Sequence, residues 1–172
     1  VCNDAEPGEE GGDPTERALV GAASDRGMDV TALREERPRE DEIAFSADRK
    51  RMTTIHDDRV FVKGAPQVLL ERCSRVLTAD GPVEMDDQMR EHVTEQVESF
   101  ASEALRVLAF AYKERDDGDP ETDLVLVGLQ GLLDPPRSEV GEAIADTYRA
   151  GIDVKMITGD NAVTAGAIAQ EV

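Results

Sequence analysis

Length and charge set the first limits on this protein. The chain has 172 residues, a mass of 18.7 kDa, and 38 acidic against 19 basic residues, which give a net charge of −19. So acidic a chain lacks the basic face that nonspecific binding to nucleic acid or to an anionic membrane requires. Apolar residues make up 40% of the chain, enough for a folded core, so the composition also excludes a wholly disordered acidic tail.

The composition also indicates where the protein works. Only four of the basic residues are lysines, and an acidic, lysine-poor surface suits a salt-rich cytosol, so we expect a halophilic source. No apolar run approaches the roughly eighteen residues of a membrane helix, and no signal peptide is evident. Cys2 and Cys73 have no companions at ligand spacing, so no metal site is expected. Because the chain opens without Met and stops within a helical pattern, we interpret it as an excised fragment.

The first 70 residues are expected to form a loop, a helix and then strands. Residues 3–12 are acidic and rich in glycine, as in a loop, and residues 13–16 (Asp-Pro-Thr-Glu) are typical of a helix start with a capping box. This helix is expected to end at Gly27, and a charged linker to cover residues 34–42. The next elements predicted are strands over 43–45, 52–56 and 59–62, a turn at 57–58, and a short helix from 66.

Residues 71–122 are expected to contain a turn, a long helix and a strand. Asp80 and Gly81 mark the turn. Apolar residues then recur at helical spacing and predict one buried helix face, formed by Met89, Val93, Val97, Phe100 and Ala104. A strand is expected over residues 107–112, and an acidic linker over 116–121.

The pattern changes after residue 122. Residues 124–133 are almost unbroken apolar, as in a strand buried on both faces, and a helix is expected over 137–150. A second buried strand is expected over residues 152–157, followed by another helix. Such alternation predicts parallel strands joined by a right-handed crossover. We therefore place a domain boundary near residue 122.

Cations gather at two places that suit an adenine nucleotide. Arg49, Lys50 and Arg51 follow an aromatic residue, Phe45, on a predicted strand, and a further lysine stands in the segment 63–66 (Lys-Gly-Ala-Pro), where a strand meets a helix. Adenine stacks on an aromatic ring, phosphates meet positive charge, and a glycine lets a ligand approach the backbone. The alternative is a basic strand edge that prevents aggregation, with the phenylalanine in the core.

Other motifs narrow the chemistry. The sequence has no Gly-Lys pair, hence no Walker phosphate loop, and no dinucleotide glycine fingerprint. Its two histidines have no neighbouring nucleophile, which argues against a hydrolase triad. Residues 158–161 (Thr-Gly-Asp-Asn) follow a predicted strand and open a predicted helix, so they suit either a phosphate site or a capped turn.

Six segments together resemble the P-type cation-transporting ATPases, in the branch that includes calcium pumps. They occur in the order of the family and cover residues 12–19, 45–52, 63–66, 105–109, 134–137 and 158–161. The resemblance implies an α+β fold over residues 1–122, a twisted antiparallel sheet flanked by helices that forms the nucleotide-binding domain. It implies an incomplete α/β phosphorylation unit of the haloacid dehalogenase type over residues 123–172.

The resemblance also implies the function. The chain would be the ATP-binding cytoplasmic part of an enzyme that couples ATP hydrolysis, through an aspartyl phosphate, to cation transport across a membrane. Its partners would be ATP and the remaining cytoplasmic and transmembrane domains of the same pump, with no nucleic acid and no direct membrane contact. Mg²⁺ is expected only in the intact enzyme, and no metal ligand is assigned here.

Site residues follow from the same resemblance. Phe45 is expected to stack on adenine, Glu16 to lie near its amino group, and Lys63 to line the pocket. Lys50, Gly64 and Arg106 are expected to complete the nucleotide site, with the arginine reaching toward the phosphates. Around the transferred phosphoryl group the resemblance assigns Thr158, Gly159 and Asp160.

Two departures from the family limit the assignment. Ala47 stands where calcium-pump relatives often carry arginine, so one phosphate contact is either missing or supplied by Arg49 or Arg51. The segment Asp-Lys-Thr-Gly-Thr, which holds the phosphorylated aspartate, does not occur in this sequence. We therefore expect the chain to bind ATP without hydrolysing it.

Two alternatives from other classes stay open. A phosphatase of the haloacid dehalogenase type would share the α/β tail, but it needs an aspartate nucleophile on a first strand. An acidic protein-interaction module without nucleotide binding would explain the charge and the helices, but it would leave the segments 63–66 and 158–161 as coincidences.

Overall fold

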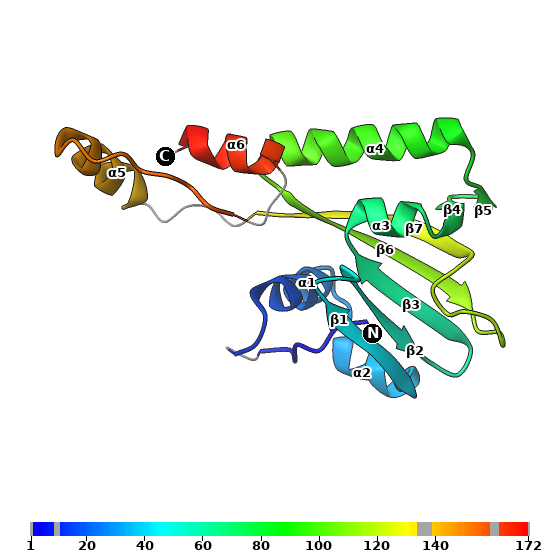
Figure 1. The fold of residues 1–172 in the computed structure, drawn as a ribbon. Coiled ribbons are helices and arrows are strands. Elements are labelled where there is room, and N and C mark those ends of the chain that lie inside the picture. The colour runs from blue at the N-terminus through cyan, green and yellow to red at the C-terminus, as the bar shows by residue number, and fades with distance from the viewer. Residues whose placement is uncertain (1, 9–10, 134–138, 159–161, 172) are drawn as a thin grey trace. The chain divides into compact units, whose positions relative to one another are not determined.

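The computed structural model describes residues 2–8, 11–133, 139–158 and 162–171 (Figure 1). Contacts within the chain divide it into two units. The first comprises Val1–Arg90 and Leu108–Gln130, and the second comprises Glu91–Val107 and Gly131–Val172. Most of the residues assigned to a nucleotide lie in the first unit.

A mixed seven-stranded sheet has the strand order β1-β2-β3-β6-β7-β4-β5. Its strands are β1 (Asp41–Ser46), β2 (Arg51–Ile55), β3 (Arg59–Gly64), β4 (Cys73–Thr78), β5 (Gly81–Glu84), β6 (Arg106–Glu114) and β7 (Leu124–Leu132). The pairs β1–β2, β2–β3, β3–β6 and β4–β5 are antiparallel, and β4–β7 is parallel. The expected α+β class is confirmed, in a sheet that is mixed because β4 and β7 run parallel.

The short strands β4 and β5 were not expected. The sequence predicts only the turn between them, where Gly81 takes a φ of 112° that favours glycine. Each strand is short, and β4 alternates buried and exposed residues weakly. They pair because β4 also joins β7, so the hairpin extends a sheet that already exists.

The bounds of the described helices are α1 (Pro14–Asp25), α2 (Val30–Glu36), α3 (Pro66–Leu70), α4 (Asp87–Ser102), α5 (Val140–Arg149) and α6 (Ala162–Glu171). Of these, α1 begins at its predicted capping residue and α3 at its predicted proline. Asp13 caps α1 by accepting hydrogen bonds from the backbone N–H groups of Thr15 and Glu16, at 2.8 and 3.1 Å. In α4, Val93 and Val97 of the predicted face are buried, together with Ala101, whereas Ala104 lies beyond the end of the helix.

The charged linker expected over residues 34–42 is wrong at both ends. Helix α2 continues to Glu36, and β1 begins at Asp41. Asp29 caps α2 by accepting a hydrogen bond from the N–H of Ala32 at 2.9 Å. The charges that suggested a linker are used in ion pairs, for example between Arg34 of α2 and Glu6.

The second buried strand expected over residues 152–157 does not form. These residues have no regular secondary structure, and Ile157 is 96% exposed. The strand expected to pair with them is β7, whose neighbours in the sheet are already β6 and β4. Strand β4 pairs with β7 only along Leu124–Leu126, and within the described residues the predicted parallel pairing and its crossover are absent.

Strand β7 also bears on the division of the chain. It is buried at its start, from Leu124 to Leu126, but Val127 is 47% exposed, so burial on both faces holds only for its first part. The expected domain boundary near residue 122 lies in the connection between β6 and β7, two strands of one sheet. The division into residues 1–122 and 123–172 stays a prediction.

Within the described ranges, no helix is long and apolar enough to cross a membrane.

Candidate functional site

Phe45 presents an exposed aromatic ring at the edge of the sheet. It lies on β1, the first strand in the sheet order. The register of β1 against β2 shifts so that Ala44 and Phe45 both lie opposite the single residue Met52, as in a β-bulge. The side chain of Phe45 is 61% exposed, so the interpretation of this residue as part of the core is wrong.

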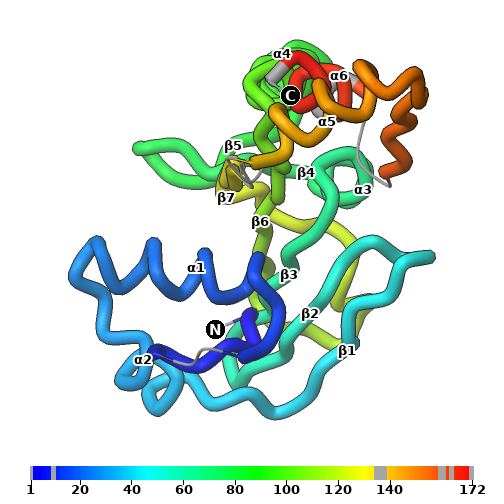
Figure 2. Tube along the Cα trace, turned by 90° about the vertical axis from the view of Figure 1, so that its left-hand side faces the viewer, coloured from blue at the N-terminus to red at the C-terminus, as the bar shows by residue number. Residues whose placement is uncertain are grey.

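Lys63 lies on the same face of the sheet. It is opposite Met52 across the β2–β3 pair, so it shares a face with the bulge that contains Phe45. The Lys63 side chain is only 9% exposed, and its Nζ forms an ion pair with Oε1 of Glu16 in the first turn of α1. Figure 2 shows α1 and α2 on one side of β1, β2 and β3. The structure thus gathers three of the predicted binding residues on one face.

Glu16 does not complete the expected capping box. Its Oε2 accepts a hydrogen bond from the backbone N–H of Asp4 at 2.9 Å, and its Oε1 binds Lys63. Both partners draw the carboxylate toward β3 and the N-terminal segment, away from the N–H of Asp13. The predicted cap by Asp13 is therefore confirmed, and the predicted capping-box contact of Glu16 is wrong.

The N-terminal segment contributes residues that the sequence did not indicate. Residues 3–12 were expected to be a loop, yet Asn3 and Ala5 are 8% and 5% exposed. The side-chain amide of Asn3 donates a hydrogen bond from Nδ2 to the backbone carbonyl of Glu16 at 3.0 Å. No local pattern announces this role, because the partners of Asn3 other than Ala5 lie between 13 and 36 residues away along the chain.

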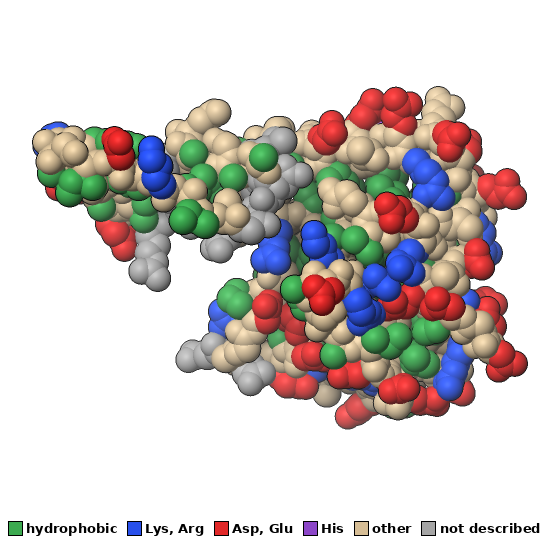
Figure 3. Space-filling view, viewed as in Figure 1, with side chains coloured by type: hydrophobic (Ala, Val, Ile, Leu, Met, Phe, Trp, Pro, Cys, Tyr) green, Lys and Arg blue, Asp and Glu red, His purple; other side chains and the backbone are tan. Residues whose placement is uncertain are grey.

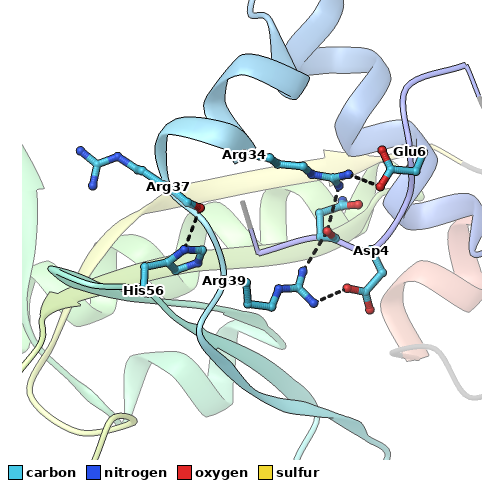
Figure 4. A pocket seen from close by; sticks show the side chains of 7 residues that line it. Asp4, Glu6, Arg34, Arg37, Arg39 and His56 are labelled. Atoms are coloured by element: carbon cyan, nitrogen blue, oxygen red, sulfur yellow. Dashed lines mark hydrogen bonds and ion pairs between the residues drawn. The ribbon is translucent and has the colours of Figure 1, made fainter.

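A cavity of about 260 Å³ lies beside this segment (Figure 4). It is lined by Asn3, Asp4, Glu6, Arg34, Arg37, Arg39 and His56. Each arginine already has a carboxylate partner: Arg34 pairs with Glu6 at 2.7 Å, Arg37 with Asp58 at 3.0 Å and Arg39 with Asp4 at 2.7 Å. The arginines therefore serve to hold surrounding chain segments together.

A second cavity of about 390 Å³ lies between the ends of several strands. It is lined by Arg75, Pro82, Tyr112, Lys113, Glu114, Arg115, Asp116, Asp123 and Val125. Neither of these two cavities includes Phe45 or Lys63. The candidate nucleotide site is thus the sheet face that carries these residues, not one of the two cavities.

The opposite face of the sheet holds a buried carboxylate, Glu121. Its Oε1 accepts hydrogen bonds from Arg49 and from Thr53, the latter at 2.5 Å, and its Oε2 accepts two from Arg51, the Nε bond at 2.8 Å. Burial would raise the pKa of Glu121, but the hydrogen bonds of Arg51 and Thr53 and the charges of both arginines outweigh it and hold that pKa below its usual value. Arg49 and Arg51, which the sequence offered as phosphate contacts, are bound to this carboxylate instead.

Lys50 and Gly64 meet where β1, β2 and β3 are joined. Lys50 has a φ of 53°, and its carbonyl accepts a hydrogen bond from the N–H of Ala65 at 2.9 Å. A Cβ on Gly64 would lie 2.5 Å from that carbonyl oxygen and 2.6 Å from Cβ of Arg51. The glycine therefore lets the start of β2 approach, which is a structural reason for its presence. A ligand contact at Lys50 or Gly64 stays a prediction.

The remaining predicted residues lie in the second unit. Arg106 begins β6 and is exposed, and Thr158 is exposed in the segment that follows α5. Gly159 and Asp160 lie outside the described residues. The roles assigned to these four residues stay predictions. Among the residues that the structure describes, no three His, Cys, Asp or Glu side chains are grouped so that they could hold a metal ion.

Comparison with known families decides the assignment. The family model for the P-type ATPase cytoplasmic domain N matches residues 1–139. The chain belongs to this family. In this P-type ATPase chain, the match includes Glu16, Phe45, Lys63 and Arg106, and it extends beyond the boundary expected near residue 122.

Individual relatives of this P-type ATPase chain agree with the family match. It is 43% identical over 186 aligned residues to calcium-transporting ATPase 1 of Lactococcus lactis. The alignment covers 100% of this chain and 21% of the relative. It is 42% identical to cation-transporting ATPase pma1 of Synechocystis, in an alignment that covers 99% of this chain and 20% of the relative. It is 40% identical to plasma membrane calcium-transporting ATPase 4 of Bos taurus, in an alignment that covers 92% of this chain and 15% of the relative. The expected family is confirmed, and the chain spans about a fifth of the length of the first two relatives.

Proposed function

We propose that this chain is the nucleotide-binding part of a P-type cation pump and that ATP binds the sheet face formed by Phe45, Lys63 and Glu16. The exposed ring of Phe45 on the same face as the Lys63–Glu16 ion pair carries this proposal. A large exposed aromatic side chain on an edge strand has no structural purpose evident in the sheet. A nucleobase supplies one, because its flat surface covers the ring.

The chemistry of the Lys63–Glu16 pair suits an amino-bearing purine. A carboxylate has about four lone-pair positions. The contacts of Glu16 within the described residues use one position on each oxygen, one for Lys63 and one for the N–H of Asp4. Its side chain is 16% exposed, so a ligand can reach the remaining positions. Glu16 would accept a hydrogen bond from the adenine amino group.

Phosphate binding would depend on few cations. We assign it to Lys50, which is exposed, since Arg49 and Arg51 are bound to Glu121. A single stacked base contributes about 1–3 kcal/mol. The phosphates meanwhile approach a protein of net charge −19. We therefore expect weak binding, with a Kd on the order of 0.1–1 mM.

The activity of the whole pump follows as a further part of this proposal. The domain would deliver ATP to an aspartate outside this sequence, and the aspartyl phosphate would drive cations across the membrane from its cytoplasmic side. Thr158, Gly159 and Asp160 would surround the transferred phosphoryl group. Mg²⁺ would accompany the triphosphate in the intact enzyme, and we assign it no ligand in this chain. Since most of the relatives described are named calcium-transporting ATPases, Ca²⁺ is the first cation to test.

A titration followed by NMR tests the binding proposal. ATP added to the 15N-labelled chain is expected to shift the amide signals of Phe45 and Lys63 and their strand neighbours. Phe45→Ala is expected to weaken binding about fivefold or more, because it removes the stacking surface. Tyr148→Ala is the matched control, because Tyr148 is also an exposed aromatic residue but lies on α5. Unchanged spectra up to several millimolar ATP would defeat the proposal.

A further inference from the structure

The segment Asn3 to Ala5 is fixed to α1 by its own hydrogen bonds. The backbone N–H of Ala5 donates to Oδ1 of Asn3 at 2.9 Å, which sets the orientation of the Asn3 amide. Nδ2 of Asn3 then donates to the carbonyl of Glu16 at 3.0 Å, and the N–H of Asp4 donates to Oε2 of Glu16 at 2.9 Å. Backbone and side chain of Glu16 are thus held by adjacent residues of one segment.

Two arginines hold the same segment from its other side. Nη2 of Arg34 donates to the carbonyls of Asn3 and Ala5, at 2.9 and 2.7 Å. Nη2 of Arg39 donates to the carbonyl of Asn3 at 3.1 Å. Figure 4 shows Arg34 and Arg39 pointing toward this segment from the chain that includes α2. Hydrogen bonds from charged donors are stronger than neutral ones, so the position of the segment is well determined.

We propose that Asn3 is a positioning residue for nucleotide recognition and that the segment Asn3 to Ala5, held by Arg34 and Arg39, fixes Glu16 so that it selects a purine bearing a 6-amino group. This inference rests on the proposed binding of ATP. The order of contacts is continuous: arginine to segment, segment to Glu16, and Glu16 to Lys63. Asn3 itself touches no ligand in this arrangement, and it acts only through Glu16.

The amide of Asn3 is suited to this role because it both accepts and donates. Its Oδ1 accepts from the N–H of Ala5 while its Nδ2 donates to the carbonyl of Glu16. Asp at this position has nearly the same shape but no donor, so it would face the Glu16 carbonyl with a second acceptor. Asn3→Asp therefore removes the contact to Glu16 with little change in packing.

The test compares ATP with ITP, which carries a 6-oxo group in place of the 6-amino group. Kd values are measured by NMR titration of the full 172-residue chain. The wild type is expected to favour ATP about tenfold, because Glu16 accepts from the amino group but repels the oxo group. In Asn3→Asp this preference is expected to fall to about twofold, through weaker binding of ATP and an almost unchanged Kd for ITP.

Two further variants make the test decisive. Arg34→Ala removes the donors to two carbonyls of the segment and is expected to reduce the preference in the same way, so the test does not depend on the folding of one variant. Gln96→Ala, which removes an exposed amide on α4, is the control and is expected to keep the wild-type preference. Urea unfolding of each variant reports its stability separately.

The possible results separate this inference from the proposed function. If the wild type binds neither nucleotide, both fail. If it prefers ATP and both Asn3→Asp and Arg34→Ala keep that preference, the inference fails while ATP binding stands. Equal losses for ATP and ITP would show a merely structural role and overturn the inference, as would a wild type that does not discriminate between them. A loss confined to ATP supports it.

Discussion

The two faces of the sheet each carry a carboxylate with cationic partners, buried for Glu121 and half-buried for Glu16, but the two differ in how many hydrogen bonds they already accept. Glu121 accepts four, two on each oxygen, from Arg49, Arg51 and Thr53. Glu16 accepts two within the described residues, one on each oxygen. Since a carboxylate has about four lone-pair positions, the first is filled and the second retains capacity. The comparison separates a carboxylate that stabilises the fold from one that can bind a ligand.

The largest expected effect is a loss of stability when Glu121 is replaced. Glu121→Ala leaves Arg51, whose side chain is 10% exposed, without its carboxylate partner. Breaking a buried ion pair on one side costs about 3–5 kcal/mol, so the free energy of unfolding in urea is expected to fall by about that amount. Glu16→Ala also leaves a cation, Lys63, without its carboxylate, but it removes two hydrogen bonds where Glu121→Ala removes four, so its cost is expected to be smaller. Equal losses would contradict this difference.

The next largest effect concerns ATP binding at Lys63, the partner of Glu16. Lys63→Ala is expected to weaken ATP binding about tenfold, since a charge-assisted interaction is lost and Glu16 is left uncompensated beside the nucleotide. Arg59 lies on the same strand, where its guanidinium lies over the ring of Tyr112 at 5.3 Å. Arg59→Ala is the matched control and is expected to change the Kd by less than about twofold. NMR titration measures both, and a larger effect at Arg59 would contradict the assignment.

The pH dependence of stability provides a smaller test. The pKa of Glu121 is lowered in the folded state, so its stabilising effect is present above the pKa of the unfolded state and is lost as the pH falls through the lower folded value. Unfolding of Glu121→Gln is therefore expected to depend less steeply on pH than unfolding of the wild type in the acid range. Urea midpoints measured between neutral pH and the acid range check this. Parallel curves would show that Glu121 is not held ionised by its arginines.

The smallest expected effect concerns the charged surface rather than these two carboxylates. Figure 3 shows Asp and Glu side chains spread over the face that it presents, with Lys and Arg side chains between them. Salt screens repulsion between exposed charges but acts weakly on buried pairs. Molar KCl is therefore expected to raise the melting temperature by a few degrees, and by a similar amount in Glu121→Ala. A melting temperature that did not rise would end the halophilic hypothesis.

Much of the fold was accessible from local patterns. The capped start of α1, the strands β1, β2, β3 and β6 and the buried face of α4 all follow from residues close together in sequence. The strand expected over residues 152–157 fails for a non-local reason. Its apolar residues satisfy the local pattern, but a strand forms only where another strand pairs with its backbone, and among the described residues none pairs with this segment. The hairpin of β4 and β5 was missed for the opposite reason, because pairing with β7 supports a weak local pattern.

For the candidate site, too, local motifs identified some residues and distant contacts decided the others. Motifs identified Phe45, Lys63 and Glu16, which the fold gathers on one face. They also suggested Arg49 and Arg51 as phosphate contacts, and a sequence cannot show that a glutamate some 70 residues later binds both. The contribution of Asn3 was likewise hidden, because its contact to Glu16 joins residues far apart in the sequence.

The sequence by itself determined the family, the capped and periodic elements and the residue types that an adenine nucleotide requires, since these depend on composition, spacing and local propensity. Only the tertiary structure decided which charged groups are already neutralised and which retain capacity for a ligand. The physical reason is that the hydrogen-bonding capacity of a side chain is used up by whichever groups the fold brings within about 3 Å, and these groups come from any part of the chain.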